Sequence, residues 1–186
     1  MGPRIALALT LVAIYSTLGV VRPVSNFLRD RGLLRVTVGI AFAVAATTAL
    51  TLIFRNPRNR TRRVVLGLIA VAIAYAAVIY PMDSPEEKIH FIEYGVVALL
   101  AYASFRRYVP AFLFVAVAGW IDEGIQALLP SRFYDLRDVA FNAAAGLMAL
   151  VALAICSPRE RGAVGTDRPE DVAEDAVGVR TDGDRS

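Results

Sequence analysis

The sequence has very few residues of the kinds that build covalent or metal cross-links. Its 186 residues include one cysteine and one histidine. The single cysteine, Cys156, cannot form an internal disulfide, and a zinc site built on several cysteines is excluded. The sequence also lacks an H-E-x-x-H motif, a glycine-rich phosphate loop and a G-x-S-x-G motif. These absences argue against zinc proteases, nucleotide-binding enzymes and serine hydrolases.

Charge is missing from five long stretches, and these determine the fold class. The chain is 56% hydrophobic, and residues 5–21, 36–54, 64–82, 108–121 and 139–158 contain no charged side chain. A bilayer-spanning helix needs about 20 mostly apolar residues, whereas barrel strands would alternate. We therefore predict an all-α, polytopic membrane helical bundle. Its six transmembrane helices are expected near 5–21, 34–54, 64–81, 88–105, 108–128 and 138–157, with Arg22-Pro23 ending the first.

The last part of the chain differs in composition from the rest. Residues 158–186 are rich in Gly, Asp, Glu and Arg and contain no aromatic residue. Such a segment cannot bury a core, so we predict a disordered tail. The expected organisation is two N-terminal helices with a basic loop (1–63), a four-helix membrane core (64–157) and a disordered cytoplasmic tail (158–186).

Basic residues near the helix ends predict how the chain is inserted. One side of the membrane would hold the N-terminus, the loop 55–63, Arg106, Arg107 and the start of the tail. The other side would hold the arginines of 22–35, Lys88 and the loop 129–137. The first side carries more basic residues, although the arginines of 22–35 oppose the trend. We therefore predict a multi-pass plasma-membrane protein with cytoplasmic N- and C-termini.

Polar residues that a membrane helix should avoid are concentrated between positions 87 and 146. They follow i, i+3, i+4 spacing, which places them on one side of each helix. The ends of the three helices that carry them are joined by loops, so they share one membrane face whichever way the chain is inserted. We predict one polar pocket there, by the orientation above on the outer side. Its catalytic candidates are His90, Glu93, Glu123 and Asp138, and its ligand-binding candidates are Lys88, Tyr94, Asp122, Gln126, Arg132 and Asn142.

These residue types define the chemistry that is open to the pocket. A histidine beside carboxylates transfers protons near neutral pH. His90 with Glu93, Glu123 and Asp138 is also a set that holds a divalent cation, although the sequence has no recognisable metal motif and we predict no metal site. Lys88 and Arg132 are suited to a phosphate, such as that of a lipid headgroup. The sequence does not indicate whether a cofactor is used.

Each candidate also has a purely structural interpretation. His90 and Asn142 serve as helix-packing hydrogen bonders, and Glu93 belongs to a structural ion pair. Asp122 caps its helix or faces water, and Gly146 allows close helix packing. The aromatic residues near helix ends are expected at the membrane interfaces; these are Tyr80, Tyr94, Tyr102, Tyr108 and Trp120.

At these polar positions the chain resembles the VanZ-like family of small membrane proteins. One part of the resemblance is K-x-H-F followed by a tyrosine. The other is an acidic pair within E-x-x-Q, followed by P-x-R, an aspartate and N-x-x-G. The chain departs from the last part, because Ala145 stands where the glycine is expected and Gly146 follows it. The matching residues are Lys88, His90, Phe91, Tyr94, Asp122, Glu123, Gln126, Pro130, Arg132, Asp138 and Asn142. The resemblance implies a role in the bacterial cell envelope, and the family is named after a protein associated with teicoplanin resistance.

Three functions remain open from the sequence. The first is a pocket that binds a lipid-linked envelope precursor or an amphiphilic antibiotic such as a lipoglycopeptide, with a link to glycopeptide resistance. The second is a membrane enzyme acting on a lipid headgroup, in which His90 and Glu123 exchange protons, Asp138 orients and Arg132 holds phosphate. The third is a proton-coupled carrier or flippase, although carriers usually place ionisable groups near the midplane. The expected partners are membrane lipids and a second copy of the chain, with no nucleic acid.

Overall fold

The fold is an all-α bundle with six helices long and apolar enough to cross a membrane. The structure is a computed structural model that describes residues 2–82, 85–129 and 134–157. No strand occurs in these ranges. The predicted disordered tail and Arg132, a predicted ligand-binding residue, lie outside the described residues. The helices are α1 (Pro3–Asp30), α2 (Leu34–Phe54), α3 (Arg62–Ile79), α4 (Pro85–Phe105), α5 (Tyr108–Ala127) and α6 (Leu136–Cys156), and a short 3-10 helix, η1 (Pro57–Arg60), joins α2 to α3.

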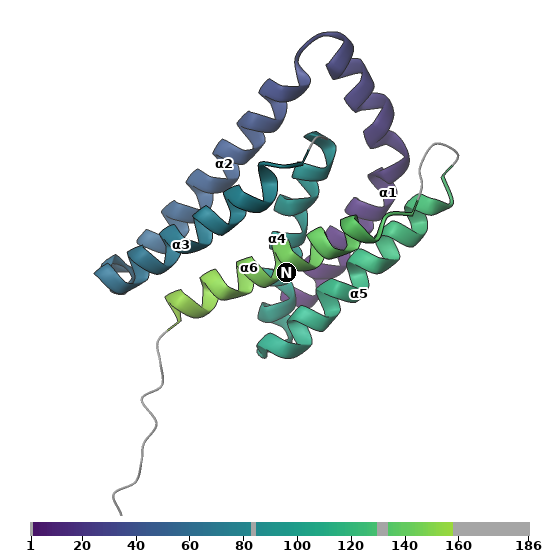
Figure 1. Ribbon diagram of the computed structural model, residues 1–186. Coiled ribbons are helices and arrows are strands. Elements are labelled where there is room, and N and C mark those ends of the chain that lie inside the picture. The colour runs from purple at the N-terminus through teal and green to yellow at the C-terminus, as the bar shows by residue number, and fades with distance from the viewer. Residues whose placement is uncertain (1, 83–84, 130–133, 158–186) are drawn as a thin grey trace, which may run out of the picture.

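The predicted helices are confirmed apart from the first, whose end was placed wrongly. Proline 23 lies inside α1, which continues to Asp30. An internal proline removes one backbone hydrogen bond and kinks a helix, but membrane helices tolerate it. The axis of α1 bends accordingly along its length (Figure 1). At 28 residues, α1 is about 42 Å long and exceeds the hydrocarbon thickness.

Local signals explain where the other helices begin and end. After α1 the chain turns at Gly32, whose φ of 70° is a conformation that glycine adopts without strain. The turn between α4 and α5 uses Arg106 with a φ of 57°. Helix α6 begins after Asp135, whose carboxylate accepts a hydrogen bond from the backbone N–H of Arg137 at 2.8 Å. That N-cap satisfies one of the unpaired donors at the start of the helix.

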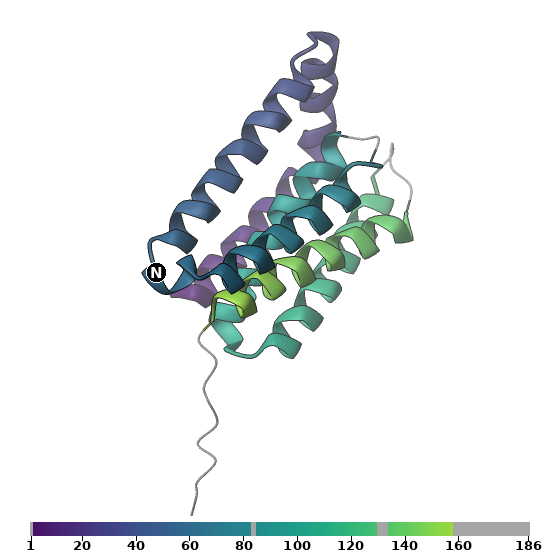
Figure 2. The same cartoon turned by 60° about the vertical axis from the view of Figure 1, so that its left-hand side comes forward.

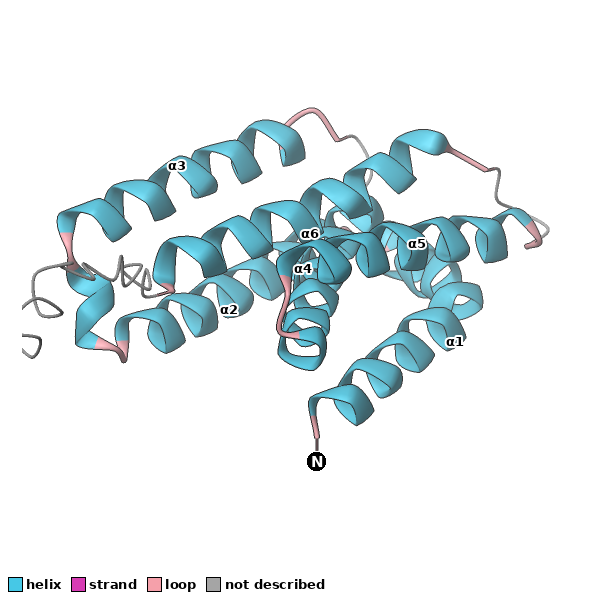
Figure 3. Cartoon of the chain, turned by 90° about the horizontal axis from the view of Figure 1, so that it is seen from below, coloured by secondary structure: helices cyan, strands magenta, loops and turns pink. Residues whose placement is uncertain are grey.

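Helix α4 lies at the centre of the bundle. It packs against α1, α5 and α6, while α3 packs on α6 and α2 is peripheral. Figure 3 shows α2 and α3 on one side of α4, with α1 and α5 on the other. The shared core is rich in alanine, because small residues let membrane helices approach closely. Its α4 and α5 members include Phe91, Val97, Ala98, Ala101, Ala111, Val115 and Ala118.

The order of the helices places the polar residues at one end of the bundle. The start of α4, the end of α5 and the start of α6 lie together, as predicted from the loops that join them (Figure 2). The N-terminus, the α2–α3 junction and the end of α6 lie at the opposite end (Figure 2). This arrangement holds whichever end faces the outside of the cell.

Candidate functional site

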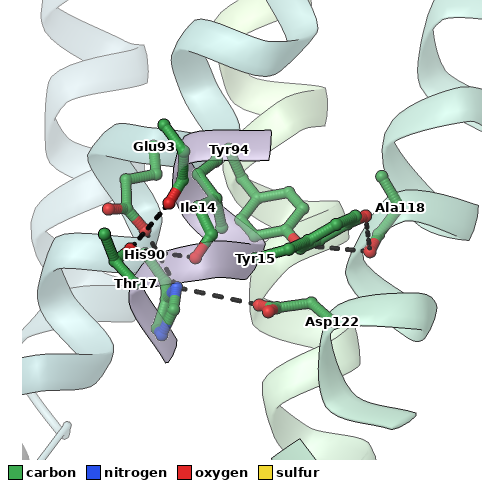
Figure 4. A network of polar contacts seen from close by, with 9 residues as sticks. Ile14, Tyr15, Thr17, His90, Glu93, Tyr94, Ala118 and Asp122 are labelled. Atoms are coloured by element: carbon green, nitrogen blue, oxygen red, sulfur yellow. Dashed lines mark hydrogen bonds and ion pairs between the residues drawn. The ribbon is translucent and has the colours of Figure 1, made fainter. Parts of the chain in front are cut away.

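The side chain of His90 lies between two carboxylates from different helices. Its Nδ1 is 3.1 Å from an oxygen of Glu93, one turn further along α4, and 3.8 Å from an oxygen of Asp122 on α5. Figure 4 shows the imidazole between these two acidic groups. The predicted placement of His90 and Glu93 on one side of their helix is confirmed. We call His90, Glu93, Tyr94, Asp122 and Tyr15 of α1 the His90 cluster.

Burial increases from the edge of this cluster to its centre. The side chain of Glu93 is 32% exposed, that of His90 is 14% exposed, and that of Asp122 is fully buried. The interpretation of Asp122 as a water-facing residue is therefore wrong. Within the described residues, neither carboxylate oxygen of Asp122 makes a hydrogen bond of good geometry, although the side chains of His90, Tyr94 and Gln126 lie beside it. The donors around this buried carboxylate are poorly aligned with it, so its oxygens can accept further hydrogen bonds.

Glu123 binds the backbone that leads into α6. Its Oε1 accepts a hydrogen bond from the backbone N–H of Asp135 at 2.9 Å. The side chain is almost completely buried, at 1% exposed. This contact gives Glu123 a structural role in holding the chain before α6. The predicted proton exchange between His90 and Glu123 stays a prediction.

The two predicted site residues of α6 lie at different depths. Asp138 is in the first turn of the helix and is partly exposed. Asn142 is buried against α5, where a Cβ added to Gly119 would lie 2.9 Å from the Cβ of Asn142. Glycine at position 119 therefore lets the asparagine approach the backbone of α5. The packing interpretation of Gly146 is supported in the same way, because a Cβ there would lie 2.5 Å from a methyl carbon of Val115.

Tyr15 was missed by the sequence analysis. Its hydroxyl donates to the carbonyl oxygen of Ala118 at 2.9 Å, and the hydroxyl of Tyr94 donates to the same oxygen at 3.2 Å. Both hydroxyls lie next to Asp122, which is one helical turn after Ala118 (Figure 4). The sequence does place this tyrosine in the middle of an apolar segment. A buried tyrosine hydroxyl usually has a hydrogen-bond partner, so its position could have indicated a contact with another helix. The interpretation of Tyr94 as an interfacial aromatic is wrong, since it is fully buried.

Of the two predicted cationic residues, Lys88 lies in the described part of the chain and is not in the His90 cluster. Lys88 is partly exposed on α4, two positions before His90. Residues two apart on a helix do not face each other, so Lys88 points to another side of α4. Pro130 and Arg132, which belong to the same predicted motif, are outside the described ranges. Among the side chains that the structure describes, no group of three or more His, Cys, Asp or Glu residues is placed to hold a metal ion.

The His90 cluster has the composition of a proton-transfer or hydrogen-bonding site. One imidazole is shared by a partly exposed carboxylate and an enclosed one, with two phenol hydroxyls beside the enclosed one. It lies near the membrane surface, because Asp122 is only five residues before the end of α5, or roughly 7.5 Å. Comparison with protein-family models, with curated proteins and with solved structures finds no match to this chain.

Proposed function

We propose that this chain is a VanZ-like protein of the bacterial envelope that binds the headgroup of a lipid-linked or amphiphilic ligand. The ligand would contact the His90 cluster at the end of the bundle opposite the termini. The proposal places the protein in the plasma membrane with its termini in the cytoplasm, so that the cluster faces the outer leaflet. Glycopeptides with a lipid tail belong to the same ligand class.

The unfilled hydrogen-bonding capacity of Asp122 is the observation that supports this proposal most directly. Its two enclosed oxygens make no hydrogen bond of good geometry in the described part of the chain, while His90 and Glu93 near it are partly exposed. A ligand hydroxyl or amine entering past Glu93 would supply better-aligned donors. Sugars and amines of lipid headgroups carry such donors at this depth of the bilayer.

The test is mass spectrometry of lipids that copurify with the protein. We compare the wild-type chain with His90→Ala and with Tyr108→Phe, a control at the opposite end that removes the hydroxyl bonded to Ser157. We expect a lipid-linked species that is retained by the wild type and the control but reduced at least about tenfold by His90→Ala. Identical lipid profiles for all three proteins would contradict the proposal.

An enzyme acting on a lipid headgroup is the second candidate. It is favoured by the 3.1 Å contact between Glu93 and the Nδ1 of His90, because a carboxylate that orients an imidazole is common in acid–base catalysis. Whole-membrane lipid analysis separates the two functions. Binding alone leaves the cell's lipid composition unchanged, whereas catalysis converts one species into another in cells with the wild type but not with His90→Ala.

The orientation is tested with cysteine labelling. In a Cys156→Ser background, single cysteines replace Arg58 at the α2–α3 junction or Tyr134 before α6, both of which are exposed. A membrane-impermeant maleimide added to intact cells should label position 134 and not position 58. The reverse pattern would place the His90 cluster at the cytoplasmic leaflet and contradict the proposed orientation.

A further inference from the structure

At the end of the bundle where α1 begins and α6 ends, the charged side chains that the structure describes are of one sign. Exposed arginines gather there from the start of α1, the α2–α3 junction and the α4–α5 turn. Every acidic side chain that the structure describes lies toward the opposite end, from Asp30 of α1 to Asp138 of α6. The arginines therefore have no acidic neighbours within the described ranges. They are Arg4, Arg55, Arg58, Arg60, Arg62, Arg63, Arg106 and Arg107.

Most of these arginines lie in or next to the α2–α3 junction, which is a turn held by hydrogen bonds. At the α2–α3 junction, the side chain of Asn56 accepts a hydrogen bond from the backbone N–H of Arg58 at 3.1 Å. The buried Asn59 donates to the carbonyl oxygen of Ile53 at 2.8 Å. Arg60 donates from Nε and from a terminal nitrogen to the carbonyl oxygen of Phe54 at 3.3 and 3.2 Å. These bonds hold the junction in one conformation with its remaining guanidinium groups outward.

Exposed apolar side chains continue from the same junction into the membrane. Leu50 and Leu52 near the end of α2 are 50% and 59% exposed, and Leu66 near the start of α3 is 54% exposed. No residue of α3 is buried. A row of guanidinium groups at the end of two apolar helix faces matches the layout of a phospholipid, with its phosphate above its acyl chains.

We propose that the α2–α3 junction binds anionic phospholipids of the surrounding leaflet. Guanidinium groups form forked, charge-assisted hydrogen bonds with phosphate oxygens, and an anionic leaflet attracts basic segments beside membrane helices. The leucines beside the junction favour a lipid over a soluble polyanion, because they contact acyl chains. This inference is independent of the His90 cluster and holds for either orientation of the chain.

The test is native mass spectrometry of the full chain released from detergent and titrated with phosphatidylglycerol or with phosphatidylcholine of the same acyl chains. The variant combines Arg58→Gln, Arg62→Gln and Arg63→Gln, and leaves Arg60 in place because it bonds the backbone. The matched control removes the same charge at the other end through Arg22→Gln, Arg31→Gln and Arg35→Gln. We expect the junction variant to lose about tenfold or more in phosphatidylglycerol affinity, and the control to change by less than about twofold.

Three results would overturn the proposal. They are equal affinity of the wild type for the two lipids, equal losses in the two variants, and full displacement of phosphatidylglycerol by inorganic polyphosphate. The last result would assign the surface to a soluble polyanion. If the junction variant fails to fold, a salt titration of the wild type decides. As NaCl is raised from about 0.05 to 0.5 M, the preference for phosphatidylglycerol over phosphatidylcholine should almost disappear. A preference that does not change with salt would contradict the proposal.

Discussion

The two ends of the bundle use ionisable residues in opposite ways. At the end where α1 begins, the charged side chains that the structure describes are arginines, which are exposed and lie on loops or helix ends. At the other end, Asp122 and Glu123 are enclosed within the bundle. An exposed cation at a membrane surface costs little, whereas a buried carboxylate must find partners or lose its charge. The enclosed end therefore carries the stronger functional signal.

The comparison also shows that packing, and not only polarity, separates the two ends. Helices α5 and α6, which lead to the enclosed carboxylates, approach each other closely at Gly119 and Gly146. The arginines lie where α2 meets α3, and neither of these helices contributes many buried residues. Substitutions should therefore be costly at the enclosed end and nearly neutral at the basic end.

The largest effect is expected from Gly146→Ala, which tests the close packing of α5 against α6. A Cβ at Gly146 meets Val115 at 2.5 Å, so α5 and α6 must separate or repack. We expect a loss of up to about 3 kcal/mol in the free energy of unfolding, measured by SDS-induced unfolding in mixed micelles. The matched control is Gly124→Ala, whose Cβ meets nothing within 4 Å and which should be neutral or slightly stabilising. If the two changes lowered the free energy of unfolding equally, the close contact at Gly146 would not contribute to the difference between the two ends.

Glu123→Ala should have the next largest effect. It removes the acceptor of the Asp135 N–H at 2.9 Å from a side chain that is almost fully buried. We expect a loss of about 2 kcal/mol in the same assay, because a polar contact at a buried site is lost. Arg58→Gln at the basic end should stay within about 0.5 kcal/mol of the wild type. A neutral Glu123→Ala would show that the enclosed end does not depend on this bond.

A double-mutant cycle between His90→Ala and Glu93→Gln measures the contact at the centre of the cluster. The 3.1 Å contact and partial burial predict a coupling free energy of about 1 kcal/mol. The control cycle pairs His90→Ala with Lys88→Gln. These positions do not face each other on α4, so their coupling should be below about 0.5 kcal/mol. Equal coupling in both cycles would mean that Glu93 is not a specific partner of His90.

Much of this arrangement follows from spacing and loop length. The uncharged stretches predict the helices, and the short connections 106–107 and 128–135 place the start of α4, the end of α5 and the start of α6 at the same end of the bundle. The i, i+3 spacing predicts the contact of His90 with Glu93. Such features are local or follow from chain connectivity, so they can be read without knowing how the helices rotate about their axes.

Features that depend on how distant helices pack were not predicted. Tyr15 is 103 residues from the carbonyl oxygen that it contacts in Ala118. Asp122 is enclosed because α4 and α1 cover it, and nothing in its own helix indicates which face they cover. The continuation of α1 beyond Pro23 was also missed, since neighbouring helices decide whether a membrane helix tolerates a proline.

The smallest effect is expected from Tyr15→Phe, which tests whether α1 belongs to the enclosed end. The change removes one of the two hydroxyls that donate to the carbonyl oxygen of Ala118 and leaves Tyr94 in place. We expect a loss of about 0.5–1 kcal/mol in mixed micelles, because the ring remains packed and one hydrogen bond is lost. Tyr80→Phe is the matched control: that side chain is 90% exposed and should be unaffected. Combining Tyr15→Phe with Tyr94→Phe should cost a different amount from the sum of the single changes, because the two hydroxyls share one acceptor. Strict additivity would mean that α1 packs beside the site without taking part in it.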